Sequence, residues 1–449
     1  MPPILALTLC TIFVLFLLCL DRKQYPEASL ALWIPTIWMM LIVTKPLGIW
    51  FGTGGVNMEE GSALDRNVLI VILCLGLITI VKRQFNWFKT MKENPWVMLL
   101  VGYMLVSVLW SDMPLTSFKR WSREFIAVVM AFFIATEVDP PKSMQSIFRR
   151  SIYILIPFSY ILIHYFPHYG RDYGRWSGAL MWIGVASQKN GLVGFCIFAA
   201  LFLIWILVRR LLGRDKPVAF YQTYIEVFLL ILTIWIFMGP QHILTYSATS
   251  AVTFALGLIA LIGLMWLKKQ NRLISPNMLT VIIVIIIVYG TVTPFVGGGL
   301  FLSDASSILN RSETLTGRTE IWAYLVPYAM QKPILGHGFG GFWTDAMRAA
   351  TSSHAHNGYL DIILNLGFTG HILFSMFLLY CCRKAQREMT RNFDWGVLWF
   401  CFILMAVIHN IAESSTISIA SRSAAVLLFF DVGAGIYNPN TDVIDKNSG

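Results

Sequence analysis

Long apolar stretches alternate with short polar ones along almost the whole chain of 449 residues. A helix of about 17 to 25 predominantly apolar residues is long enough to cross a bilayer. The pattern predicts about 12 to 13 such spans, of which the third, fourth and last are short: 3–20, 29–51, 66–81, 95–110, 122–137, 151–167, 190–208, 219–238, 245–267, 277–296, 358–382, 395–412 and 419–437. We therefore predict an all-α polytopic membrane protein.

The composition supports a membrane class. Hydrophobic residues make up 57% of the chain and charged residues 13%, whereas about a quarter of a soluble domain is charged. All seven cysteines lie within the apolar stretches, so a disulfide framework is excluded, and none has the CxxC spacing of a metal site. The first apolar stretch has no basic residue before it and no cleavage site after it, so we expect a retained span rather than a signal peptide.

Basic residues predict the orientation, because Lys and Arg in short loops mark the cytoplasmic side. Six alternate loops hold 20 of the 34 basic residues. This bias predicts an outer amino terminus, an inner carboxyl terminus and segment 297–357 on the outer face, which is the periplasm in a Gram-negative bacterium. The net charge of +10 mostly reflects the same bias, and we expect no nucleic-acid partner.

Residues 1–449 are expected to form a single membrane domain, within which 297–357 is one large periplasmic loop. In this loop Ile321, Trp322, Leu325 and Val326 recur at helical spacing. They predict an amphipathic helix on the membrane surface, ended by Pro333. The glycine-rich stretch 335–342 is expected to be a turn-rich connection, because the strand and the Lys-Ser/Thr of a phosphate-binding loop are both missing.

Two histidines at the end of this loop are the first candidates for chemistry. The imidazole of His356 changes charge near neutral pH, which suits a general base, although a loop histidine is more often an ordinary surface residue. His354 shares a face with His356 if the segment is extended. A metal site would need a third ligand, for which Asp345 and Asp361 are the nearest carboxylates. The spacing matches no standard zinc motif, so no metal and no cofactor is expected.

Ten further basic residues gather in three loops of the predicted outer face. Such charge on the side that the topology rule disfavours indicates an anionic ligand, and the fork of an arginine suits phosphate. The alternatives are solvated loop charge and contact with lipid headgroups. The residues are Lys119, Arg120, Arg123, Arg171, Arg175, Lys189, Arg311, Arg318, Lys332 and Arg348.

Three segments carry a resemblance to a known family: 315–322 with its Gly-Arg-x-x-x-Trp pattern, 333–338, and 354–360 followed by Gly367 and Gly370. Together with the His-Asn-x9-Gly-x-x-Gly pattern they resemble the O-antigen ligase and polymerase superfamily, most of all its exopolysaccharide-polymerase branch. The resemblance covers about residues 105–435. Supporting positions are Trp110, Ser111, Pro114, Arg120, Gly178, Lys189, Asn190, Gly191 and Glu413.

The resemblance implies a metal-independent, inverting glycosyltransferase of the bacterial inner membrane. Such an enzyme moves a glycan from an undecaprenyl-diphosphate carrier to an acceptor hydroxyl on the periplasmic face. His356 would deprotonate the acceptor, and Arg318 would hold the diphosphate. A second basic residue usually opens the ninth span of the family, but the stretch 245–250 has none. The candidates to replace it are Lys189 and Arg175; further substrate contacts are expected from Arg120, His354, Asn357 and Glu413.

Three functions remain open. A polymerase of a cell-surface polysaccharide, working beside a flippase and a chain-length regulator, is preferred. A ligase that transfers the glycan to lipid A core or another acceptor would use the same donor chemistry. The third possibility is a transporter of a solute or glycolipid, which would usually carry more acidic residues deep in its spans. The candidate buried charges here are Lys45, Glu226, Asp361, Glu413 and Asp431.

Overall fold

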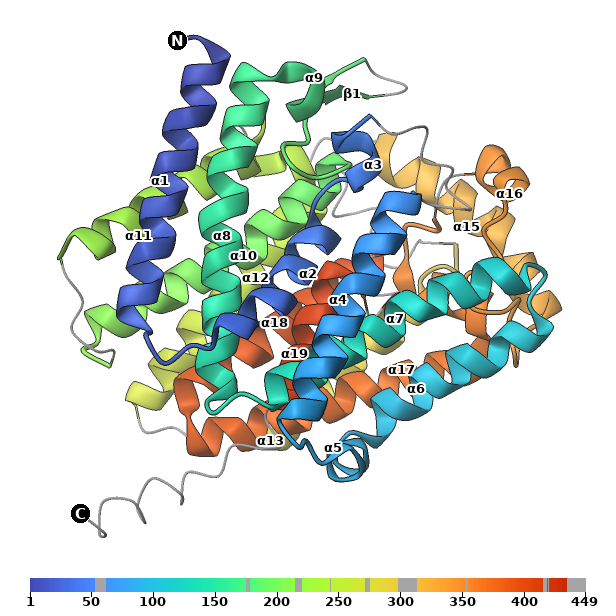
Figure 1. Cartoon of the computed structure of the whole chain (residues 1–449). Helices are drawn as coiled ribbons and strands as arrows, with labels where there is room; N and C mark the ends of the chain where they lie inside the picture. The colour runs from blue at the N-terminus through green and yellow to red at the C-terminus, as the bar shows by residue number, and fades with distance from the viewer. Residues whose placement is uncertain are drawn as a thin grey trace.

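The protein is a helical membrane protein (Figure 1). The structure, a computed structural model, describes residues 1–52, 62–174, 178–214, 220–242, 244–270, 275–297, 313–351, 354–414, 418 and 420–433. Its elements are α1 Pro3–Gln24, η1 Leu30–Leu32, α2 Trp33–Val43, α3 Leu47–Trp50, α4 Ala63–Lys82, α5 Trp87–Glu93, α6 Pro95–Val106, η2 Ser107–Trp110, α7 Pro114–Ala135, α8 Pro140–Tyr165, α9 Pro167–Gly170, β1 Arg171–Tyr173, β2 Leu180–Trp182, α10 Lys189–Leu211, α11 Phe220–Met238, η3 Leu244–Ser247, α12 Ala248–Lys269, α13 Pro276–Val292, α15 Glu313–Gln331, α16 Asp345–Ala350, α17 Gly358–Arg391, α18 Phe393–Ala412 and α19 Arg422–Gly433.

The apolar stretches of the sequence coincide with helices, but not all are complete spans. Within the described ranges, eight helices are long and apolar enough to cross a membrane: α1, α4, α8, α10, α11, α12, α17 and α18. A ninth results if α5 and the helix that follows it, bent by 97° at their junction, form one broken span. Leu30–Val43, Asn277–Val292 and Ser423–Gly433 are shorter apolar helices. The sequence pattern thus predicts where the helices lie better than it predicts which of them are long enough to span a membrane.

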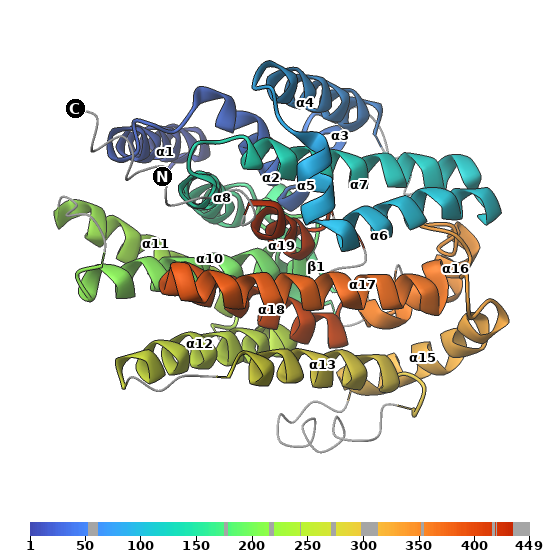
Figure 2. The same ribbon diagram turned by 90° about the horizontal axis from the view of Figure 1, so that it is seen from below.

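The centre of the bundle is packed with aromatic side chains. Helix α19 lies among α2, α7, α8 and α18 (Figure 2). Its Phe430 stacks on Trp399 of α18, with ring centroids 5.4 Å apart, and both side chains are completely buried. The last predicted span is therefore a core element, because its large apolar side chains face other helices on several sides.

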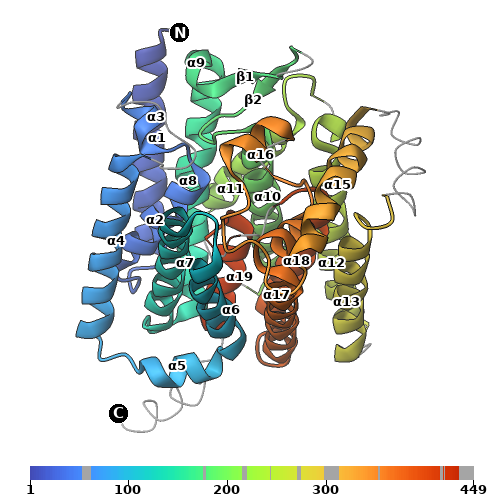
Figure 3. The ribbon, with the colours of Figure 1, turned by 90° about the vertical axis from the view of Figure 1, so that its right-hand side faces the viewer.

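Two of the predicted outer segments, the N-terminus and 167–190, lie at the same end of the molecule. The N-terminus, α9 and the hairpin of β1 and β2 lie at one end, and α5 lies at the other (Figure 3). The hairpin is antiparallel and pairs Arg171 with Trp182; the hydrophobic pattern did not predict it.

The described part of segment 297–357 contains the predicted helix and connection. Helix α15 ends two residues before Pro333, and turns follow through the glycine-rich stretch. This stretch packs on α17 where Gly367, at φ +65°, interrupts the helix. The freed N–H of Phe368 donates to the carbonyl of Pro333 at 2.7 Å. A Cβ at Gly367 would lie 2.2 Å from the Ile334 carbonyl oxygen, so only glycine fits this break.

Candidate functional site

Glu413 is the point at which the candidate residues meet. It directly follows α18, and the residue is buried at 8% exposure. Its Oε1 accepts hydrogen bonds of 2.9 Å from Arg318 Nη2 and from Asn190 Nδ2. Its Oε2 lies 3.6 Å from His356 Nδ1, which is an ion-pair distance rather than that of a hydrogen bond. One carboxylate thus joins groups from α10, α15 and the segment before α17.

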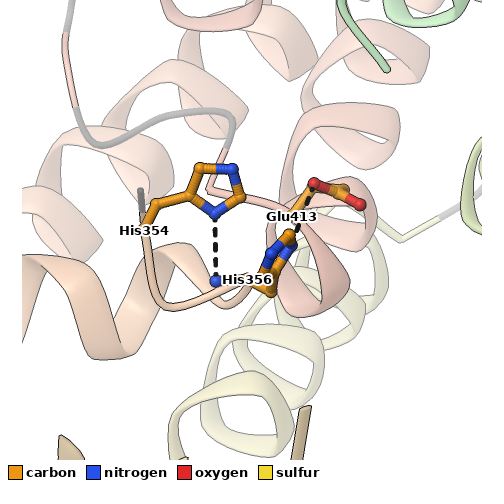
Figure 4. Close-up of side chains that lie close together, drawn as sticks. All are labelled: His354, His356 and Glu413. Carbon is orange, nitrogen blue, oxygen red and sulfur yellow. Dashed lines mark hydrogen bonds and ion pairs between the residues drawn. The ribbon is translucent and has the colours of Figure 1, made fainter. Parts of the chain in front are cut away.

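The backbone of His356 is held in an unusual conformation. Its φ is +52°, in the left-handed region that few residues other than glycine adopt. Its N–H donates to His354 Nδ1 at 3.2 Å, and the two imidazole rings meet edge to face with centroids 4.1 Å apart. The His356 side chain then points toward Glu413 (Figure 4). Both histidines therefore belong to one cluster.

Asn357 has a structural role at the start of α17. It is fully buried and caps α17, since its Oδ1 accepts a 2.9 Å hydrogen bond from the N–H of Leu360. Its Nδ2 donates to the carbonyls of Gly290 and Ile411, at 2.9 and 3.0 Å. Asn357 therefore ties the start of α17 to α13 and α18, and this fixes the segment that carries His356.

Helix α15 explains the Gly-Arg-x-x-x-Trp spacing. Arg318 and Trp322 are four residues apart, so they lie on the same face of the helix. Arg318 reaches Glu413, while the Trp322 indole donates from Nε1 to the carbonyl of Ala355 at 2.8 Å. One face of α15 thus contacts Glu413 through Arg318 and the peptide between the two histidines through Trp322.

The charges of the cluster follow from its contacts. Burial by itself would raise the pKa of the Glu413 carboxyl, but His356 and Arg318 outweigh burial and hold that pKa at about 2. Burial and the neighbouring His356 lower the pKa of His354 to about 4. Glu413 is therefore ionised and His354 neutral at pH 7.

His354, His356 and Glu413 have ligand atoms within 4.8 Å of one another, so they could hold a metal ion. Two imidazoles and a carboxylate are also a zinc-type donor set. However, the same carboxylate binds the Arg318 guanidinium, and His354 Nδ1 already accepts the His356 N–H. The third donor is Glu413 and not the expected Asp345 or Asp361, which contact Arg348 and Trp343 respectively.

Lys189 borders the stretch that lacks the second basic residue of the family. It begins α10, beside Asn190. Its Nζ lies 3.4 Å from the carbonyl oxygen of Tyr246 and 4.9 Å from the centroid of the Tyr246 ring. The amino group of Lys189 thus lies against residues 245–250. Arg175, the other candidate, lies outside the described residues.

Arg120 takes a different position. It donates from Nη1 to the carbonyl of Gly340, whose N–H in turn donates to Asn365 Oδ1 at 2.9 Å. Arg120 therefore lies on the glycine-rich connection. Asn190, by contrast, touches Glu413 although the sequence suggested it only as a supporting position.

Two comparisons with known proteins bear on this geometry. Residues 242–375 match the model of the family described as O-antigen ligase, and this stretch includes Arg318, His354 and His356. The chain is also 23% identical over 302 residues to the exopolysaccharide production protein ExoQ of Rhizobium meliloti. That alignment covers 63% of this chain and 63% of the relative. Both comparisons support the resemblance of this chain to the O-antigen ligase and polymerase superfamily.

Proposed function

We propose that this protein is a polysaccharide polymerase that transfers a glycan from an undecaprenyl-diphosphate carrier to the hydroxyl of an acceptor glycan. The observation that carries the proposal is the Glu413 carboxylate between His356 and Arg318. This carboxylate brings His356, a potential proton acceptor, close to the guanidinium of Arg318, which suits a diphosphate. The bias of basic residues toward the predicted inner loops supports a periplasmic site in the inner membrane.

In the proposed reaction His356 acts as the general base. Its Nδ1 faces Glu413, so Nε2 is the nitrogen that takes the proton from the acceptor hydroxyl. The hydroxyl oxygen then forms a bond to the anomeric carbon, while the bond from that carbon to the diphosphate oxygen breaks. Attack from the face opposite the leaving group inverts the configuration. Glu413 stabilises the imidazolium that forms, as a buried carboxylate does in other bases of this type.

The leaving diphosphate needs positive charge as the bond breaks. Arg318 supplies it from one side; only its Nη2 is committed to Glu413 at 2.9 Å, and a guanidinium has five N–H donors. Lys189 supplies it from the other side and replaces the basic residue missing from 245–250. In this proposal no metal ion takes part, since Arg318 and Lys189 provide the cationic groups.

A polymerase is preferred over a ligase because the relative from Rhizobium meliloti is named for exopolysaccharide production. A flippase that delivers the donor and a regulator of chain length would then be its partners. A ligase that transfers to lipid A core uses the same residues and differs only in the acceptor.

The test uses the purified full chain in liposomes that contain an undecaprenyl-diphosphate oligosaccharide. We expect the wild type to release undecaprenyl diphosphate and to lengthen the glycan, and His356→Ala to do neither. His168→Ala is the matched control, because this exposed histidine lies in α9 and is not one of the residues of the Glu413 cluster, and it should keep full activity. A His356→Ala protein that still lengthens the glycan would refute the proposed base, and a wild-type protein that does not lengthen it would favour a transporter.

A further inference from the structure

The peptide groups around Ala355 are fixed from two sides. Ala355 lies between the two histidines and is completely buried. Its N–H donates to Asp361 Oδ2 at 3.1 Å, and its carbonyl accepts from Trp322 Nε1 at 2.8 Å. The carbonyl that Trp322 holds belongs to the same peptide plane as the His356 N–H, which donates to His354. Two consecutive peptide planes before His356 are therefore fixed by side chains.

Asp361 also joins this segment to the one that carries Glu413. Its Oδ1 accepts from Trp343 Nε1 at 2.9 Å, and its Oδ2 accepts from the hydroxyl of Ser414, the residue after Glu413. Three donors thus converge on one carboxylate that is fully buried. A carboxylate suits this place because it only accepts hydrogen bonds, with two oxygens available.

Neither Asp361 nor Trp322 can be a chemical participant. Their exposed fractions are 0% and 1%, so a substrate cannot reach them. Both side chains hydrogen-bond to the backbone of Ala355. The next residue, His356, has the left-handed backbone conformation. Such a backbone is strained and persists only where the surroundings fix it.

We infer that Asp361 and Trp322 form a peptide clamp that positions His356 against Glu413. This inference rests on the proposed function, since it assigns the clamp to the proposed base. Loosening the clamp lets the His356 backbone relax, and a displacement of about 1 Å at a reacting group can cost about 100-fold in rate. Donor binding by Arg318 and Lys189 does not pass through Ala355, so the clamp affects kcat rather than the KM for the donor.

The experiment compares Trp322→Phe with Trp205→Phe in the liposome assay. Both tryptophans are buried, and both indoles donate to a carbonyl at 2.8 Å, Trp205 to that of Asp394 far from the histidines. Each variant keeps the ring and loses one N–H. We expect Trp322→Phe to lower kcat about 10-fold or more, with the donor KM within about 2-fold, because a small displacement of the base acts on the chemical step. Trp205→Phe should keep the wild-type kcat.

Asp361→Asn is a second variant that tests the clamp in the same assay. The amide keeps the size of the side chain but places an NH2 group where Asp361 now accepts donors, so we expect the same selective loss of kcat. The double variant should lose less than the product of the two single losses, because both residues hold the same peptide. Should Asp361→Asn not fold, Trp322→Phe decides alone.

The inference is overturned if folded Trp322→Phe keeps the wild-type kcat, or if Trp205→Phe loses as much. It is also overturned if Trp322→Phe changes only the midpoint of thermal unfolding and not the rate per folded molecule. An active His356→Ala protein, in contrast, would refute the proposed function itself. The two failures are therefore distinguishable.

Discussion

Arg318 Nη2 donates a 2.9 Å hydrogen bond to Glu413 Oε1. The arginine proposed to hold the diphosphate thus shares a carboxylate with the proposed base, His356. Binding of the donor and activation of the acceptor are coupled through Glu413, since a change in its charge acts on both groups. Glu413 should therefore matter more than a peripheral substrate contact.

Glu413→Gln tests this coupling. Glutamine keeps the size and one acceptor oxygen, so the contacts to Arg318 and Asn190 can persist, but the charge that stabilises an imidazolium is lost. We expect kcat to fall about 100-fold or more, in the range that general-base catalysis contributes. Turnover in the liposome assay measures this. Wild-type turnover in Glu413→Gln would show that His356 works without its carboxylate.

Arg318→Lys tests the geometry of the diphosphate contact. Lysine keeps the charge but loses the planar fork, and its compact ammonium cannot present two parallel N–H donors to phosphate as a guanidinium does. We expect most of the activity to be lost, and Arg318→Ala to lose at least as much. If Arg318→Ala transferred the glycan at the wild-type rate, the diphosphate role of Arg318 would be wrong.

Lys189→Ala tests whether this lysine replaces the missing basic residue. Removing its ammonium should weaken the donor contact and raise the donor KM about 10-fold, which corresponds to about 1.4 kcal/mol, while Lys189→Arg should keep most of the affinity. Lys119→Ala removes an exposed lysine of the predicted outer face and is the matched control. Equal donor KM values in the Lys189→Ala and Lys119→Ala proteins would exclude Lys189 from the site.

The lowered pKa of His354 predicts a pH dependence of stability. The imidazole goes from an ordinary pKa of 6.5 to about 4 in the folded protein. The unfolded chain therefore binds the proton more readily than the folded protein between these values. The stability should be complete above pH 6.5 and decrease as the pH falls toward 4. Thermal unfolding midpoints measure this decrease, which should be smaller in His354→Gln and unchanged in His168→Ala.

Chelation tests the choice between a metal centre and a protein-only base. The guanidinium of Arg318 on Glu413 disfavours a dication at the His354, His356 and Glu413 cluster. Transfer should therefore continue after treatment with excess EDTA. An activity that disappears with EDTA and returns with zinc would assign the cluster to a metal instead.

The sequence predicts local features of this protein well. The apolar stretches locate the helices, and the spacing of Trp322 and Leu325 predicts α15, because burial of a helical face leaves a periodic pattern. The break at Gly367 has a sequence signal only in the glycine itself. The hairpin of β1 and β2 was missed because each strand has only three residues.

The contacts that build the site are not readable from the sequence, because they join distant positions. Arg318 and Glu413 are 95 residues apart, and Asn190 and Glu413 are 223 apart. The resemblance to the family named most of these residues but not their pairing. It offered Arg120 as a substrate contact, and this stays a prediction; in the folded chain Arg120 donates to Gly340. The roles of Asp361 and Trp343 emerge only from three-dimensional packing.

The length of the polymer made in cells shows whether His356 is the base of glycan transfer. A strain that lacks this gene is complemented with wild-type protein or with His356→Ala, and membrane levels of both proteins are matched. We predict long polymer with the wild type and only single repeat units with His356→Ala. Polymer of normal length from His356→Ala would contradict the account.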